Sequence, residues 1–152
     1  MDPAEAAQLF RLKERRIDAM RALAGAVNAS DLRKLSVPDE VRDALIAGVA
    51  DPYPPVRFWC LQLLDHLPDP VVLPAICRAL DDAVPRVRRL AAHALECGMC
   101  KPTWDGALPP EAVTKLAELA SNDVNKKVRD EASFALTCSS RWVPQDEPAD
   151  SR

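Results

Sequence analysis

Apolar residues recur at helical spacing in three similar segments of the chain. In each segment a valine lies ten residues before an aspartate, and small or apolar residues follow it at intervals of three or four. That spacing predicts an amphipathic helix with one buried stripe. The stripe consists of Val41, Ala44, Leu45 and Gly48 in the first segment, Val72, Ala75, Ile76 and Ala79 in the second, and Val113, Leu116, Ala117 and Ala120 in the third.

A second helix is predicted in each segment, beginning near a Val-Arg pair that lies five residues after the aspartate. Inside this helix a small residue and a leucine occupy two fixed columns four residues apart, which suits close helix packing. The small column is Cys60, Ala91 and Ala132, and the large column is Leu64, Leu95 and Leu136. Each segment is therefore predicted to form a helix, a tight turn and a second helix.

The aspartate and the arginine of this pattern recur together in all three turns. They are Asp51, Arg57, Asp82, Arg88, Asp123 and Arg129. A carboxylate in a turn can accept hydrogen bonds from backbone N–H groups, and an arginine can reach the carboxylate of a neighbouring turn. We expect an Asp-Arg ladder that joins repeat to repeat. Ligand binding by the three arginines is the alternative.

The triplicate Asp-x4-Val-Arg pattern resembles the HEAT repeat family, and in particular the short HEAT-like repeats of phycobilin lyases, deoxyhypusine hydroxylase and bacterial adaptor proteins. The resemblance covers roughly residues 38–140. It implies an all-α fold, an α-α superhelix or HEAT-like solenoid of three helical-hairpin repeats. It specifies the fold and leaves the function open.

The same pattern divides the chain. We expect an N-terminal capping helix and connector in residues 1–35, with Asp2 and Pro3 as its start signals, and the three repeats in 36–140. The repeats span about 38–67, 69–99 and 109–139, with a loop insertion at about 98–108. Residues 141–152 are acidic and contain prolines, which favours a flexible tail.

A partner surface follows from the resemblance, because the second helices of HEAT proteins line the concave face. The residues opposite the predicted buried stripe are Phe58, Leu61, Gln62, Asp65, Arg89, Ala92, His93, Glu96, Asp130, Ser133, Phe134 and Thr137. The partner-binding candidates among them are Phe58, Leu61, Gln62, Arg89, His93, Asp130 and Phe134. Three of these are apolar where solvent is expected, which indicates a patch that another protein could cover. The alternative is that the helices roll slightly and bury them.

The insertion carries a second candidate site. The repeats are spaced 31 and then 41 residues apart, and the added residues contain a Cys-x2-Cys motif four residues after a histidine. This spacing suits zinc. The candidate ligands are His93, Cys97, Cys100 and Cys138, with His66 as another choice for the fourth. The alternative is that the cysteines are small, semi-buried apolar residues and His93 is an ordinary surface histidine. A redox pair is disfavoured, because Cys97 ends a helix, where the dipole opposes a thiolate.

The charge balance weighs against nucleic acid as the main partner. The net charge is -3 and the pI is near 5.4. A basic edge nevertheless exists, formed by Arg86, Arg88, Arg89, Lys126, Lys127 and Arg129. It could bind phosphate or nucleic acid, but solvated charge with local pairing to Asp81, Asp82 and Asp123 accounts for it better.

Catalytic motifs are missing from the sequence. The four glycines leave no material for a phosphate-binding loop, and no nucleophile elbow is found. The iron-binding His-Glu pairs of deoxyhypusine hydroxylase are not matched, because Leu67 follows His66 and Ala94 follows His93. A role like that of phycobilin lyases rests on the fold alone. We therefore expect a non-enzyme.

The remaining expectations concern cellular context. The five cysteines are odd in number, and no apolar stretch could span a bilayer or serve as an export signal. We expect a cytoplasmic monomer with reduced thiols and no membrane contact. It would bind a protein partner of unknown identity and no cofactor, with zinc as the alternative.

Overall fold

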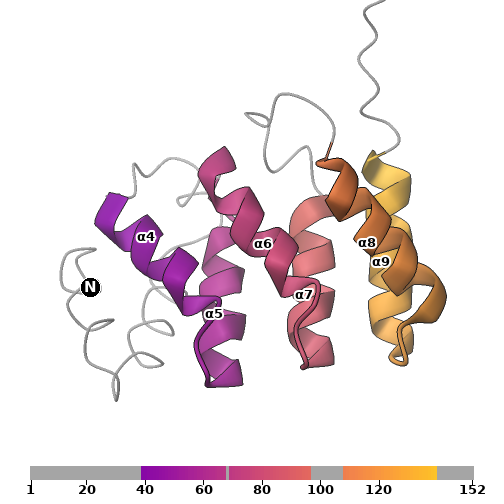
Figure 1. The fold of residues 1–152 in the computed structure, drawn as a ribbon, viewed down its shortest axis with the longest axis horizontal. Helices are drawn as coiled ribbons and strands as arrows, with labels where there is room; N and C mark the ends of the chain where they lie inside the picture. Colours follow the sequence, from indigo (N-terminus) through magenta and orange to yellow (C-terminus); the bar gives the residue numbers. More distant parts are fainter. Residues whose placement is uncertain (1–38, 68, 97–107, 140–152) are drawn as a thin grey trace, which may run out of the picture.

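The computed structural model describes residues 39–67, 69–96 and 108–139, and every regular element in these ranges is a helix. The elements are α4 (Asp39–Gly48), α5 (Pro54–Leu64), the 3-10 helix η1 (Pro70–Val72), α6 (Leu73–Ala79), α7 (Pro85–Glu96), α8 (Pro110–Asn122) and α9 (Lys126–Ser139). Helices α4 and α5, α6 and α7, and α8 and α9 form three successive hairpins (Figure 1). The expected capping helix, the insertion up to residue 107 and the acidic tail lie outside the described residues.

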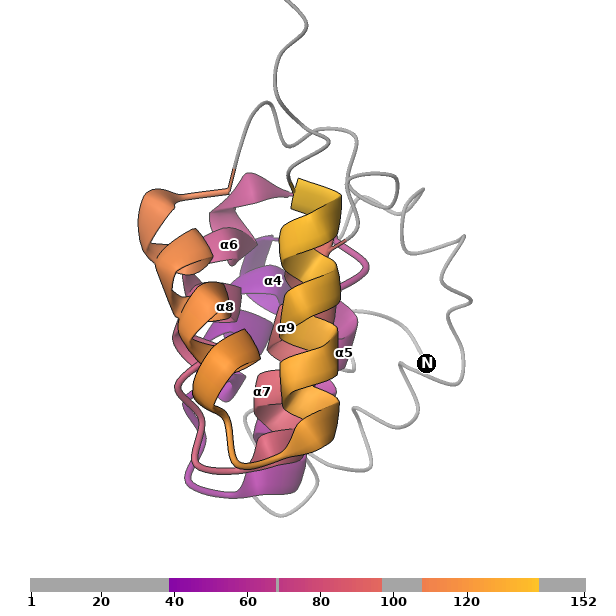
Figure 2. The same ribbon diagram turned by 90° about the vertical axis from the view of Figure 1, so that its right-hand side faces the viewer.

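The hairpins stack side by side in two layers. Figure 2 looks along the stack and shows α4, α6 and α8 on one side and α5, α7 and α9 on the other. Each second helix also packs on the next, since α5 contacts α7 and α7 contacts α9. The predicted all-α solenoid of hairpin repeats is confirmed for the described part of the chain.

Proline and aspartate fix where the second helices begin. Helices α5 and α7 start at Pro54 and Pro85, and proline is well suited to a first helical turn because its φ is already helical. Before each start, the aspartate of the turn accepts a hydrogen bond from the backbone N–H two residues later. The carboxylate of Asp51 accepts from Tyr53, that of Asp82 from Val84 and that of Asp123 from Asn125, at 2.8 to 2.9 Å.

The core runs continuously between the two layers. The three small residues of the predicted column, Cys60, Ala91 and Ala132, are fully buried. They allow the layers to approach closely. A Cβ atom added to Gly48 in α4 would collide with the sulfur of Cys60 in α5. Small residues at this crossing are therefore a packing requirement.

The predicted stripe was wrong in the third repeat. Val113 is 37% exposed and Ala117 is also exposed, whereas Ala112, Leu116 and Leu119 form the buried face of α8. The cause lies in how the first helices end. The N–H of Asp51 bonds three residues back to Gly48, and that of Asp82 bonds likewise to Ala79. The N–H of Asp123 bonds four residues back to Leu119, so α8 keeps α-helical geometry to its end and its buried face shifts by one residue.

Candidate functional site

The turn edge of the stack holds the Asp-Arg ladder. Arg57 donates from Nε and Nη2 to both carboxylate oxygens of Asp82, at 2.6 and 2.9 Å. Arg88 binds Asp123 in the same way, at 2.7 and 3.0 Å. The remaining nitrogen Nη1 of Arg88 donates to the carbonyl of Asp82 in its own turn, at 2.7 Å. Two bidentate bridges therefore join the three repeats.

The bridges change the acidity of their carboxyl groups. A hydrogen bond from Arg88 is the main reason that the pKa of Asp123 is below its ordinary value. Burial alone would raise the pKa of Asp82, but hydrogen bonds from Arg57 and from the N–H of Val84 outweigh burial and lower it. Both aspartates are thus held as carboxylates by their partners. Since Arg57 and Arg88 are engaged in this way, the alternative that they bind a ligand has no support in the geometry.

A groove runs along the second-helix layer, on the face where the partner site was predicted. It encloses about 310 Å³ and is lined by Phe58, Gln62, Arg86, Arg89, Leu90, His93 and Glu131. A neighbouring hollow of about 330 Å³ is lined by Pro54, Pro55, Phe58, Trp59, Val84, Arg86 and Val87. Phe58 and Arg86 line both spaces, and the guanidinium carbon of Arg86 lies 4.0 Å from the centre of the Phe58 ring. A cation over an aromatic face therefore separates a polar groove from an apolar hollow.

Four of the predicted partner residues lie in this groove, namely Phe58, Gln62, Arg89 and His93. Asp130 and Phe134 are exposed on α9 but do not line it, and Phe134 is 55% exposed.

The predicted exposure of Leu61 was wrong, because it is fully buried, as is Ala92 in the matching position of α7. Each of these residues belongs to a second helix that is followed by another one packed on it, α7 after α5 and α9 after α7. Ser133 occupies the same column in α9 and is exposed, because no further repeat follows α9 among the described residues.

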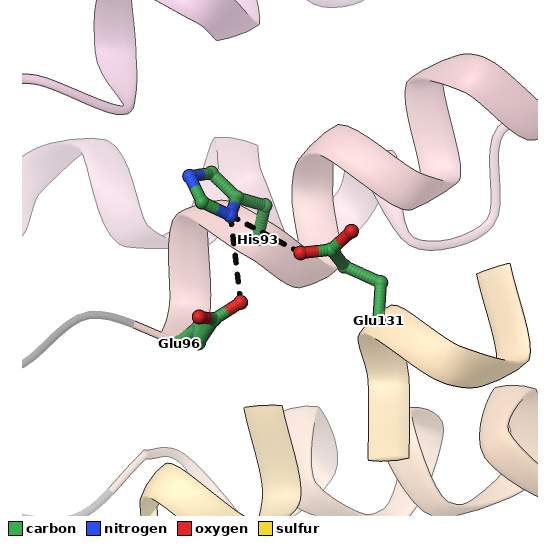
Figure 3. Close-up of side chains that lie close together, drawn as sticks. All are labelled: His93, Glu96 and Glu131. Atoms are coloured by element: carbon green, nitrogen blue, oxygen red, sulfur yellow. Dashed lines mark hydrogen bonds and ion pairs between the residues drawn. The ribbon is translucent and has the colours of Figure 1, made fainter. Parts of the chain in front are cut away.

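At one end of the groove, three side chains from two helices converge on one point (Figure 3). His93 and Glu96 come from α7 and Glu131 comes from α9. The Nδ1 atom of His93 is 3.2 Å from Oε1 of Glu131 and 3.4 Å from Oε2 of Glu96. Arg89 donates from Nε to the other oxygen of Glu131, at 2.8 Å. Charged and polar groups therefore join α7 to α9 at the groove edge.

The two glutamates of this cluster differ in acidity. Burial is the main reason that the pKa of Glu96 is raised, and the nearby carboxyl of Glu131 raises it further. Burial also opposes ionisation of Glu131, but hydrogen bonds from Arg89, His93 and Glu96 outweigh burial and lower its pKa. Glu131 thus holds the negative charge that Arg89 neutralises. Glu96 is a half-buried carboxyl group, and no arginine of the described ranges forms an ion pair with it.

Of the four predicted zinc ligands, His93 and Cys138 lie in the described part of the chain, and the structure does not bring these two together. Cys97 and Cys100 lie outside the described residues. Cys138 is half-buried on α9 and does not belong to the donor cluster around His93. Among the described residues, the donor atoms that could share one ion belong to His93, Glu96 and Glu131.

Sequence reasoning missed Glu131. Its column in the second helices holds Trp59 and Leu90 in the first two repeats, both apolar, so the column as a whole does not point to a polar site. A charged residue in an otherwise apolar column was the available signal. Its carboxylate reaches back to α7, where Arg89 and His93 stand one helical turn apart.

The basic edge is largely occupied by contacts within the protein. Arg88 belongs to the ladder, Arg89 is bound to Glu131, and Lys126 pairs with Asp130 at 2.6 Å. Arg86 has no ion-pair partner within the described residues, and it lies over Phe58 instead. Two cations of this edge, Arg86 and Arg89, line the groove, and within the described ranges Arg86 is the one of the two that forms no ion pair.

A comparison with protein families matches residues 42–137 to HEAT repeats, and the chain belongs to the HEAT repeat family. Repeats of this family typically mediate protein interactions or scaffolding, and the family is generally non-catalytic. A search of curated proteins found no match. None of the helices in the described ranges is long and apolar enough to cross a bilayer.

Proposed function

We propose that this protein is a non-catalytic adaptor that binds a segment of a partner protein in the groove between α5 and α7. The observation that carries this proposal is the pairing of Arg86 with Phe58 at the border of two hollows. A guanidinium that has no carboxylate partner and rests on an aromatic ring is a typical anchor for an interface.

The chemistry of the two hollows indicates what the partner segment carries. The apolar hollow, with its prolines and Trp59, suits one apolar or aromatic side chain. The adjacent guanidinium of Arg86 suits a carboxylate. Each hollow, at about 310 and 330 Å³, accommodates one or two side chains rather than a folded domain. We therefore expect a short segment with an acidic residue next to an apolar one.

Variants on either side of the groove test this proposal. Phe58→Asp and Arg86→Glu alter the anchor, whereas Phe134→Asp places the same charge on an exposed residue that does not line the groove. The full-length tagged proteins would be used to capture partners from an extract of the source cells, followed by quantitative mass spectrometry. We expect one protein to be recovered by wild type and Phe134→Asp and lost with both groove variants.

The folding control is circular dichroism with a thermal melt for every variant. Arg86→Glu guards against a loss caused by unfolding, because Arg86 is exposed and contributes little to the core. Recovery of the same proteins with both groove variants would refute the groove as the binding surface. Loss with Phe134→Asp alone would move the site to the exposed side of α9.

A further inference from the structure

The cluster at the end of the groove has more acceptor atoms than donors. His93 brings at most one proton on Nδ1, and the nearer of the two glutamate oxygens is Oε1 of Glu131, at 3.2 Å. Oε2 of Glu96 is buried and makes no hydrogen bond to any other group that the structure describes. Its 3.4 Å approach to His93 is an ion-pair distance without hydrogen-bond geometry. A buried carboxylate oxygen without a partner is costly unless a proton or a cation neutralises it. A proton shared with Glu131 fills this role in the metal-free protein, in line with the raised pKa of Glu96, and a bound cation would take its place.

The outward atoms of Glu131 and His93 face a second set of groups. Arg89 binds Oε2 of Glu131 and leaves Oε1 turned toward His93. The far ring nitrogen of His93, Nε2, lies 3.9 Å from a carboxylate oxygen of Asp65, the buried residue that directly follows α5. Metal-binding histidines and carboxylates are usually oriented in this manner by partners on their outer atoms.

The separations also match those of ligands on one ion. Zinc bonds to nitrogen and oxygen measure about 2.0 to 2.2 Å, so two ligands on a tetrahedral ion lie about 3.3 to 3.6 Å apart. His93 Nδ1 lies 3.4 Å from the oxygen of Glu96, which is within this range, and 3.2 Å from the oxygen of Glu131, which is 0.1 Å below it. All three donor atoms lie within 4.8 Å of one another. Two carboxylates and one neutral imidazole carry a charge of about -2, which balances a divalent cation.

We propose that His93, Glu96 and Glu131 bind one divalent metal ion, zinc by the nature of the donors, which ties α7 to α9. The imidazole of His93 is half exposed at the groove, so the fourth position of the ion is open to a water molecule or to a donor from another protein. This site differs from the one expected from the cysteine motif, since it uses two glutamates and no thiolate. It stands independently of the adaptor proposal.

Metal binding by the full-length protein tests this site. Metal-stripped protein would be dialysed to equilibrium against zinc, and bound zinc would be measured by mass spectrometry. We expect about one zinc per chain for wild type and an affinity at least about 10- to 100-fold weaker for His93→Gln, Glu96→Gln and Glu131→Gln. Glu111→Gln is the matched control, because Glu111 is an exposed glutamate of α8 outside the cluster.

Cobalt as a substitute for zinc distinguishes the donors. Binding through His93 and the glutamates gives visible absorption without a thiolate-to-cobalt charge-transfer band, and Cys100→Ser leaves it unchanged. A thiolate band that disappears with Cys100→Ser would overturn the proposal in favour of the cysteine site. Absence of zinc binding, or binding that survives both glutamate substitutions, would also overturn it. Circular dichroism confirms that each variant is folded, and zinc should raise the melting temperature of wild type but not of Glu131→Gln.

Discussion

Two edges of the repeat stack use charged groups to join one repeat to the next, and they do so differently. At the turn edge, the bridge from Arg57 to Asp82 and the bridge from Arg88 to Asp123 agree within 0.1 Å in both of their bonds. The same chemistry therefore recurs at both junctions. A contact that stacking requires must recur with the repeat.

At the groove edge the two junctions are unlike each other. The junction of α5 and α7 places Arg86 over Phe58. The junction of α7 and α9 places Glu131 between Arg89 and His93. A contact that one junction has and the other lacks is not demanded by the fold. The difference teaches that, in this protein, the repeated residues build the scaffold and the residues that break the repeat are the candidates for function.

Two adjacent arginines of α7 test this division most strongly. Arg88 belongs to the ladder and its side chain is 13% exposed, whereas Arg89 belongs to the groove and is 51% exposed. Arg88→Ala leaves the buried carboxylate of Asp123 without its partner and should lower the free energy of unfolding by about 3 kcal/mol. Arg89→Ala should lower it by less than about 1 kcal/mol. Urea unfolding followed by circular dichroism measures both values.

Equal losses from the two arginine variants would contradict the division into scaffold and groove. Asp81→Ala beside Asp82→Ala provides a second matched pair. Asp81 is exposed and pairs with Lys115 at the surface, while Asp82 is nearly buried and pairs with Arg57 in the Asp-Arg ladder. The first substitution should have a small effect and the second a large one.

Acid should weaken the turn edge. The pKa values of Asp82 and Asp123 are lower in the folded protein than in an unfolded chain, because their arginine partners favour the carboxylates. The stability that they contribute is therefore complete above the unfolded value of about 3.9 and is lost as the pH falls through the lower, folded values. In Arg88→Gln the pKa of Asp123 should return toward its ordinary value. This variant should then lose less stability than wild type between neutral and strongly acidic pH, as measured by urea unfolding at each pH. A parallel loss in both proteins would contradict this origin.

The sequence was sufficient for the scaffold because its residues recur. Three copies of the aspartate and the Val-Arg pair, in register, fixed the hairpins, the turns and the bridges between the turns. The sequence was insufficient for a helix that is buried on more than one face. Periodicity alone shows that Leu61 lies off the first buried stripe, but it cannot show that the next second helix covers it. The shift of the buried face of α8 accompanies a different helix end, with a bond four residues back at Asp123 where Asp51 and Asp82 bond three residues back, and the apolar spacing does not show this difference.

The candidate site was predicted in part for the same reason. His93 and Arg89 were placed on the groove by their positions in the second helix. Glu131 and its contact with both residues depend on how α9 packs against α7, across 38 residues of sequence from His93. Contacts between repeats are set by packing, so they follow from the structure and not from the spacing within one repeat.

The smallest expected effect compares the two glutamates of the groove edge in metal-free protein at neutral pH. The folded pKa of Glu96 is raised, mainly by burial, so its ionised form opposes folding and stability increases as the pH falls through that value. Glu96→Gln removes this charge and should stabilise the protein by less than about 1 kcal/mol. The pKa of Glu131 is lowered because its bonds from Arg89, His93 and Glu96 outweigh burial, so Glu131→Gln should destabilise the protein by a similar amount. Thermal melts in the presence of a chelator measure the change in melting temperature for both variants, and a change of the same sign in the two would contradict the difference between the two glutamates.

With zinc present, the proposed site predicts that Glu96→Gln becomes destabilising, because the variant loses the stabilisation that bound metal gives to the wild type.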